Sequence, residues 1–161
     1  MKHSVKPVLV FTWGNPSRGD DALGTLVHDS LLQQDLAGFD LLTDFQLQIE
    51  HAMDLEKREC ILFVDTSVTA SAPYEFTQLF PVEDDSYTTH AMSPQSLLAV
   101  YQKINRQQPP PAFLLSIRGY EFGLGLPLSG QAADNLDKAI GFIQQLLTET
   151  QCSQWPDWVH R

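Results

Sequence analysis

A turn with two adjacent aspartates constrains most strongly what this chain can fold into: residues 14–24, GNPSRGDDALG. The turn follows an apolar run, residues 8–11, that predicts a buried strand, and it leads into a segment with the apolar spacing of a helix. Asp20 and Asp21 therefore lie where a strand passes into a helix, at the carboxyl edge of the expected sheet. Open α/β sheets bind ligands at this edge. Two adjacent carboxylates there indicate a site for a metal ion or a proton.

Strand and helix signals alternate along the chain. We expect strands at 8–13, 39–45, 61–64, 74–80 and 112–117, and helices at 21–33, 46–58, 93–105 and from 128 onward. The 74–80 strand alternates in the manner of a half-buried edge strand. Ser93-Pro94 is a typical helix start, with serine as N-cap and proline at the first helical position. This order predicts an α/β fold, a three-layer sandwich with a mostly parallel five-stranded sheet and helices on both faces.

In the segment at 46–58, we expect Leu47, Ile49 and Met53 on the buried side of the helix. The stretches 66–73, 82–90 and 119–125 carry few apolar residues or many glycines, and we expect them to be loops.

The length and the net charge of the chain limit the kinds of protein that it can be. A chain of 161 residues is long enough for one domain with a real core, so we expect a single domain over 1–161 that ends in a tail at 152–161. Lys and Arg total 10 against 20 Asp and Glu, a formal charge of −10, which disfavours nucleic acid and anionic membranes as partners. No signal peptide and no long apolar run is recognisable, so we expect a cytoplasmic protein without a membrane partner.

The two cysteines lie in different contexts, Cys60 in an apolar strand run and Cys152 in the tail. Their spacing predicts neither a disulfide nor a metal knuckle, and we interpret them as a small buried hydrophobe and a tail thiol. Trp155 and Trp158 in the tail either pack on their own domain or contact a partner.

Three side chains fall where a doubly wound sheet could bring them together. Asp21 follows the first strand, Asp65 ends the third, and His90 ends an acidic loop. Two carboxylates and one imidazole suit a divalent cation such as nickel, zinc or iron. Each also has a simpler interpretation: Asp20 or Asp21 caps the first helix, Asp65 forms a turn, and His90 is an exposed loop residue.

Other candidates are weaker. We expect His28 to be a solvated residue of the first helix, and His51 to have a surface or packing role. The sequence has no Gly-x-Ser-x-Gly elbow, no phosphate-binding Gly-x-x-x-x-Gly-Lys loop and no His-Glu-x-x-His motif. Common serine-hydrolase, nucleotide-binding and zinc-protease chemistries are therefore disfavoured.

The motif Gly14-Asn15-Pro16-x-x-Gly19-Asp20-Asp21-x-x-Gly24 resembles the N-terminal motif of the hydrogenase maturation endopeptidases. These proteases remove a C-terminal extension from the large-subunit precursor of nickel–iron hydrogenases. The likeness continues through residues 63–65 (FVD), 90–94 (HAMSP), 118–123 (RGYEFG) and 128–129 (LS), so it extends from the first strand into the last helix. It implies the phosphorylase/hydrolase-like form of the three-layer fold.

Two details of the likeness point to a branch. The form Gly19-Asp20-Asp21-Ala22-Leu23-Gly24 and residues 45–51 (FQLQIEH) are most similar to the branch that serves bidirectional, NAD-linked hydrogenases. Ala22 stands where many members have glycine, and residues 45–51 replace a segment that contains Gly-Thr in other branches.

The resemblance implies a metal site made of Asp21, Asp65 and His90, by motif match. It implies a nickel-dependent endopeptidase whose nickel is supplied by the precursor, with other divalent metals as substitutes. Cleavage would then be conditional, because three ligands cannot close around a cation that is absent. Asp20, or an oxygen of Asp21 that does not bind the metal, is a candidate base for activating water. The loops at 66–73 and 119–125 are candidates for contacts with the precursor peptide.

Two alternatives of other classes remain open, a metal-binding module on the same scaffold and a non-catalytic chaperone for the large subunit. For the protease and for the chaperone the expected partner is the hydrogenase large-subunit precursor, and we expect a monomer.

Overall fold

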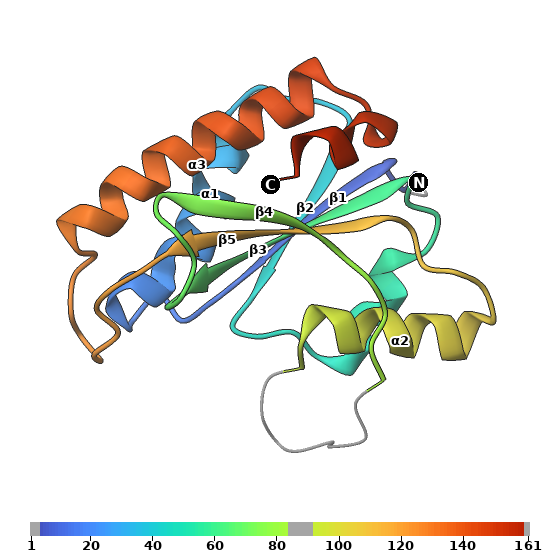
Figure 1. Ribbon diagram of the computed structural model, residues 1–161, viewed down its shortest axis with the longest axis horizontal. Helices are drawn as coiled ribbons and strands as arrows, with labels where there is room; N and C mark the ends of the chain where they lie inside the picture. The colour runs from blue at the N-terminus through green and yellow to red at the C-terminus, as the bar shows by residue number, and fades with distance from the viewer. Residues whose placement is uncertain (1–3, 84–91, 160–161) are drawn as a thin grey trace.

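The computed structural model describes residues 4–83 and 92–159, and within them one five-stranded sheet forms the centre of the molecule (Figure 1). The strands are β1 (Val8–Trp13), β2 (Phe39–Asp44), β3 (Cys60–Ser67), β4 (Tyr74–Leu79) and β5 (Ala112–Arg118), in the spatial order β2-β1-β3-β5-β4. All pairs are parallel except β4–β5, which is antiparallel at the edge. The predicted sheet, including its edge strand at 74–80, is confirmed.

Helices cover both faces of the sheet and bury two separate cores. On one face, α1 (Leu23–Gln33) and α3 (Gly130–Glu149) cover apolar side chains such as Val10, Leu62 and Leu115. On the other face, α2 (Pro94–Asn105) and the short 3-10 helix η2 (Ile49–Leu55) cover Leu9, Phe11 and Phe63. The predicted three-layer architecture is therefore confirmed.

Local capping explains where the two long helices start. The Ser93 hydroxyl accepts a hydrogen bond from the Ser96 N–H at 3.1 Å, with Pro94 at the first helical position of α2. In the same way, Ser129 accepts from the Ala132 N–H at 3.2 Å and begins α3. A side-chain acceptor of this kind satisfies one of the N–H groups that a helix start leaves unpaired.

The helix expected at 46–58 is wrong in length and in its buried side. Only η2 forms there, and it buries Ala52 and Leu55 while Ile49 and Met53 are 47% and 76% exposed. A 3-10 helix has three residues per turn, so its buried face repeats differently from that of the α-helix we expected. Of the three residues predicted to face inward, Leu47 alone is buried, and it precedes η2.

The first helix begins later than expected. Residues Gly19–Ala22 form a short 3-10 turn, η1, and α1 starts only at Leu23. Asp20 and Asp21 thus lie in a separate turn before the helix, and neither is the N-cap of α1.

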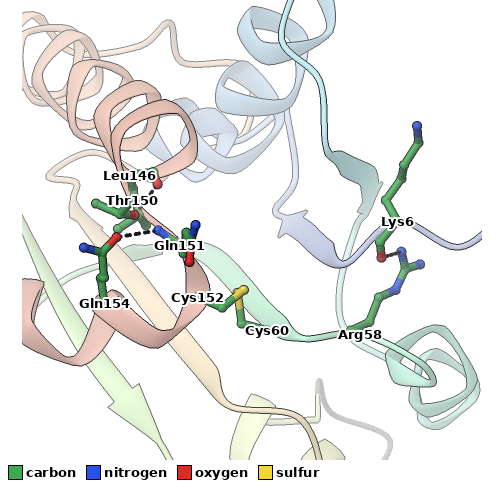
Figure 2. Close-up of a disulfide and its surroundings, with 8 residues drawn as sticks. All are labelled: Lys6, Arg58, Cys60, Leu146, Thr150, Gln151, Cys152 and Gln154. Carbon is green, nitrogen blue, oxygen red and sulfur yellow. Dashed lines mark hydrogen bonds between the residues drawn. A yellow bond between two sulfur atoms is a disulfide. The ribbon is translucent and has the colours of Figure 1, made fainter.

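The prediction that the cysteines do not pair is wrong, because Cys60 and Cys152 form a disulfide with Cα atoms 5.8 Å apart (Figure 2). They are 92 residues apart in sequence. The start of β3 and the segment after α3 meet only because of the strand order, which the spacing along the chain does not reveal.

The tail folds back onto the domain as a third 3-10 helix, η3 (Cys152–Trp158). Trp155 is 1% exposed, with its ring 5.4 Å from Phe113 and 6.4 Å from Phe76. Trp158 packs against Phe142, with ring centroids 5.8 Å apart. Of the two interpretations of these tryptophans, packing on their own domain is confirmed.

Within residues 4–83 and 92–159, the helices are too short or too polar to cross a bilayer.

Replacing Trp155 by alanine tests how much the tail stabilises the domain. We expect Trp155→Ala to lower the free energy of unfolding by about 3–5 kcal/mol, because it leaves a cavity against Phe76 and Phe113. Chemical denaturation of wild type and variant measures this, with Leu32→Ala, at a side chain that is 68% exposed, as the control. A loss below about 1 kcal/mol would contradict the assigned packing.

Candidate functional site

The carboxyl ends of the parallel strands meet at one edge of the sheet, which we call the carboxyl edge. Asp21 lies in η1, directly after β1, and Asp65 lies near the end of β3, the neighbour of β1. Repulsion by the charge of Asp21 contributes to the raised pKa of Asp65, so the two carboxylates lie close enough to interact. Both carboxylates thus lie at the carboxyl edge, as expected, and their approach to within coordination distance stays a prediction.

Close backbone packing holds Asp21 in place. Its Oδ2 accepts a hydrogen bond from the Asn15 N–H at 2.8 Å. Behind it, Gly24 lies directly on the backbone of Trp13, and a Cβ at this position would collide with the Trp13 carbonyl oxygen. A glycine is required for so close an approach of helix to strand.

Asp65 has a strongly perturbed acidity. Burial, with a smaller contribution from the charge of Asp21, raises the pKa of Asp65 to about 7, against opposing hydrogen bonds from the Thr66 N–H and the Trp13 side chain. The Thr66 bond measures 2.7 Å. A carboxylate with a pKa near 7 beside a second carboxylate is a typical feature of a functional site.

Trp13 is a site residue that the sequence analysis missed. It ends β1, is 8% exposed, and donates a side-chain hydrogen bond to Asp65. Its ring packs edge-on to Phe63, with centroids 5.8 Å apart. The available signal was its place as the last residue before the Gly14 turn, where a strand residue reaches the carboxyl edge.

Asp20 is fully buried and serves a different purpose from Asp21. Its carboxylate accepts hydrogen bonds from the backbone N–H groups of Tyr120 (2.7 Å), Glu121 (3.0 Å) and Ser129 (2.7 Å), and from the Ser129 hydroxyl (2.7 Å). Burial alone would raise its pKa, but these bonds, led by the one from the Ser129 backbone, outweigh burial and lower it. A carboxylate with four donors and no exposure has little capacity to act as a base.

The backbone around Asp20 is tied as firmly as its side chain. The Asp20 N–H donates to the Glu121 carbonyl at 2.7 Å, and the Asp20 carbonyl accepts from the Thr66 hydroxyl at 3.0 Å. Gly19 has φ +55°, and a Cβ there would collide with the same Glu121 carbonyl oxygen. Asp20 therefore joins the first turn to β3 and to the loop between β5 and α3, which favours a structural role over the base considered above.

The third predicted ligand, His90, lies outside the described residues. Among residues 4–83 and 92–159, no three His, Cys, Asp or Glu side chains gather closely enough to hold a metal ion. Asp21 and Asp65 therefore form an incomplete set, and the metal site remains a prediction.

The two histidines within residues 4–83 and 92–159, His28 and His51, have local partners. His51 accepts from the Gln48 N–H at 2.8 Å, lies 3.2 Å from Asp44 and packs on Phe11, which confirms its expected packing role. His28 pairs with Asp29 on α1 at 3.2 Å, and its side chain is 18% exposed, so it is less solvated than expected.

Exposed apolar side chains surround the carboxyl edge. The loops after β2, β3 and β5 each carry some: Phe45 (66% exposed), Ile49 (47%), Val68 (62%), Leu124 (71%) and Leu126 (46%). A cavity of about 300 Å³ lies between the ends of β1 and β2, lined by Gly14, Pro16, Thr25, Thr43, Asp44 and Phe45. Apolar surface of this extent beside a polar site is typical of a surface that binds another polypeptide.

The two carboxylates fit a cation chemically. Asp65 holds its proton up to about pH 7, partly because a second negative charge lies beside it. A divalent cation between the two would replace that proton and remove the repulsion, and oxygen donors suit such ions.

Removing the charge of Asp20 tests its structural role. We expect Asp20→Asn to lower the free energy of unfolding by about 3 kcal/mol or more at pH 7, because an amide cannot accept all four bonds and turns a donor toward other donors. Since the folded pKa of Asp20 lies below its ordinary 3.8, the stabilisation is present above that pH and is lost as the pH falls. Denaturation from pH 7 to pH 2 should show the two proteins converging in acid, and a constant difference would contradict the assignment.

Asp65 should give the opposite pH dependence. Between pH 3.8 and about 7 the folded state binds more protons at Asp65 than the unfolded state, so stability falls as the pH rises through this window. Because Asp65→Asn is neutral throughout, its melting temperature relative to wild type should increase steadily from pH 4 to pH 8. Melting curves over this range measure the effect, and a difference independent of pH would contradict the buried, repelled state of Asp65.

Comparison with known proteins gives a clear result for the fold. No family model matches the sequence. No curated protein matches it either. Solved structures do match: the NiFe hydrogenase maturation protease HycI from Thermococcus kodakarensis KOD1 superposes with a TM-score of 0.67 at 20% identity, over 88% of this chain and 93% of that one.

Two further structures extend the likeness. The hydrogenase maturating endopeptidase HybD from E. coli gives a TM-score of 0.68 at 18% identity, over 88% of this chain and 92% of that one. The hydrogenase 2 maturation peptidase from a Thaumarchaeota archaeon gives 0.63 at 23% identity, over 90% and 100%. At these identities the similarity establishes a shared fold over nearly the whole length of each chain.

Proposed function

We propose that this protein is a maturation endopeptidase that removes the C-terminal extension of a nickel–iron hydrogenase large-subunit precursor after nickel insertion. The observation that carries the proposal is the pairing of Asp21 and Asp65 at the carboxyl edge, within a motif and a fold that hydrogenase maturation proteases share. The nickel belongs to the precursor, so it is part of the substrate.

In this proposal Asp21 and Asp65, with His90, bind the nickel that the precursor presents. Asp65 must first lose its proton, because only the ionised carboxylate is a ligand. The Asn15 N–H and the Trp13 side chain hold the two carboxylates in position for this contact. A precursor without nickel offers these side chains no cation to bind, so it binds poorly and is not cleaved.

The same residues limit the choice of a base. Asp20 is enclosed by four donors, so an oxygen of Asp21 is the better candidate for taking a proton from water. Asp20 supports catalysis indirectly, by fixing the turn that carries Asp21.

The apolar side chains around the carboxyl edge supply the polypeptide contacts. Phe45, Val68 and Leu124 come from three different loops, so together they can hold an extended chain across the edge. The 300 Å³ cavity beside Phe45 has room for a side chain of that chain.

Finer points of the proposal rest on the sequence. Residues 45–51 and the Gly19–Gly24 form favour a bidirectional, NAD-linked hydrogenase as the target, and a monomer acting in the cytoplasm is the expected working form.

Substitution of the predicted ligands tests the function. We expect Asp21→Ala, Asp65→Ala and His90→Ala each to remain folded and to reduce processing of nickel-loaded precursor by at least about 100-fold, because each removes one of three ligands. The measurement is the mass of the precursor over time, with nickel-loaded and nickel-free precursor in parallel. Asp29→Ala, at an exposed carboxylate on α1, is the matched control and should process like wild type.

The outcomes separate the three functions considered. Loss of a C-terminal peptide from the loaded precursor alone supports the protease. A tight complex without any change in mass would instead indicate a chaperone. Binding of free metal, with no binding to either precursor, would indicate a metal-binding module. If one of the three ligand variants cleaves at the wild-type rate, the residue replaced in it is not a metal ligand.

A further inference from the structure

The disulfide lies at the edge of the sheet opposite Asp21 and Asp65. Cys60 is the first residue of β3, whereas Asp65 lies near its carboxyl end. Cys152 is the first residue of η3, so the bond joins the tail helix to the central part of the sheet (Figure 2). No role in the proposed cleavage depends on this pair.

Apart from this bond, a few apolar contacts hold η3 to the domain. Trp155 packs edge-on against the stacked rings of Phe76 and Phe113, and Trp158 packs on Phe142. The capping hydrogen bonds of the segment are local, such as Gln151 N–H to the Gln154 side chain at 2.8 Å (Figure 2). A helix of seven residues has little stability of its own, so its position depends on the covalent bond together with the packing of Trp155.

Two surface cavities reach the disulfide from different sides. One, of about 380 Å³, is lined by Val8, Phe39, Glu59, Cys152 and Trp155 among others; the second, of about 320 Å³, is lined by Glu59, Pro111, Gln151, Cys152 and Ser153. Cys60 is fully buried, while Cys152 is half-buried and lines both cavities. Of the two cysteines, Cys152 is therefore the one that a small thiol in these cavities would meet.

We propose that the Cys60–Cys152 bond is an exchange site for a dithiol reductant, and that its redox state sets the stability of the protein without disturbing the carboxyl edge. The proposal does not depend on the proposed function.

The chemistry balances as ordinary thiol–disulfide exchange. A thiolate of the reductant attacks the Cys152 sulfur, and Cys60 leaves as a thiolate that takes up a proton. The second thiol of the reductant then attacks the reductant's own sulfur in this mixed disulfide and releases Cys152. Two electrons and two protons pass to the protein, and the reductant leaves with an internal disulfide.

Position and charge favour a dithiol without negative charge. After the first step, Cys60 remains buried beside Cys152, which now carries the reductant in a mixed disulfide. If the reductant is a monothiol, Cys60 can attack this mixed disulfide, expel the monothiol and restore the original bond. A dithiol avoids this return, because its own second thiol breaks the mixed disulfide and releases Cys152. Glu59 lines both cavities and the chain carries a formal charge of −10, which repels an anionic thiol such as glutathione.

The sheet isolates the carboxyl edge from this event. Side chains alternate along β3, so Cys60 packs in the core under α1 and α3 with Leu62 and Val64, while Asp65 lies on the opposite side with Phe63. β3 is paired along its length with β1 and β5. Reduction therefore frees η3 without moving Asp65.

Alkylation and melting of the wild-type protein test the proposal. In protein purified without reductant, neither cysteine should react with N-ethylmaleimide under denaturing conditions. After incubation of the native protein with dithiothreitol, both should react, and the melting temperature should fall by roughly 5–15 °C. Cys152→Ser is the matched control, and its melting temperature should not respond to dithiothreitol. Glutathione at equal thiolate concentration should reduce wild type more slowly than dithiothreitol.

Hydrogen exchange locates the change. After reduction we expect faster exchange at residues 152–159 and unchanged protection at the amides of Thr66, Tyr120 and Ser129. Alkylation of both cysteines before reduction, failure of dithiothreitol to reduce the native protein, an unchanged melting temperature, or lost protection at those three amides would each overturn the proposal. These readouts need no precursor, so they remain informative even if the protein is not a protease.

Discussion

The buried charge of Asp20 is the interaction on which the carboxyl edge depends. A carboxylate without exposure is costly in free energy unless donors replace its water, and here three backbone N–H groups and one hydroxyl do so. Those donors lie 100 to 109 residues further along the chain. The side chain of Asp20 thus fixes the first turn against the loop between β5 and α3, and its backbone carbonyl ties the same turn to β3 through the Thr66 hydroxyl.

The two adjacent aspartates, Asp20 and Asp21, have different environments and different roles in this arrangement. Asp20 is buried and has a lowered pKa, whereas Asp21 accepts a hydrogen bond from the Asn15 N–H and helps to raise the pKa of Asp65. The short 3-10 turn η1 places the two carboxylates in these different environments. Pairs of titratable groups with divergent environments are a common way for a fold to separate structural support from chemistry.

Features with local causes could be predicted from the sequence, and those with distant causes could not. The bounds of β1 and the start of α2 follow from an apolar run and from the Ser93-Pro94 cap, so both agree with expectation. The prediction of an α-helix at 46–58 was wrong, because the apolar residues there have α-helical spacing whereas the segment forms a 3-10 helix with a different repeat. The disulfide and the fourfold contacts of Asp20 were missed because each joins segments far apart in the chain.

In the candidate site, too, the sequence predicted what has a local cause and missed what depends on distant contacts. Position at strand ends sufficed to place Asp21 and Asp65 at the same edge of the sheet, because neighbouring parallel strands end there. It could not show that Trp13 reaches Asp65, since that depends on the side-chain direction at the end of β1. His90 stays a prediction.

The cavity that Val8 and Cys152 share has a practical consequence for redesigning the chain. Because the first strand and the last helix border the same hollow, a short linker could join them without crossing the molecule. The backbone could then be opened at another surface loop to give a circular permutant with the same sheet order. Val8 and Cys152 both lie at the opposite edge of the sheet from Asp65, so changes made there leave the carboxyl edge intact.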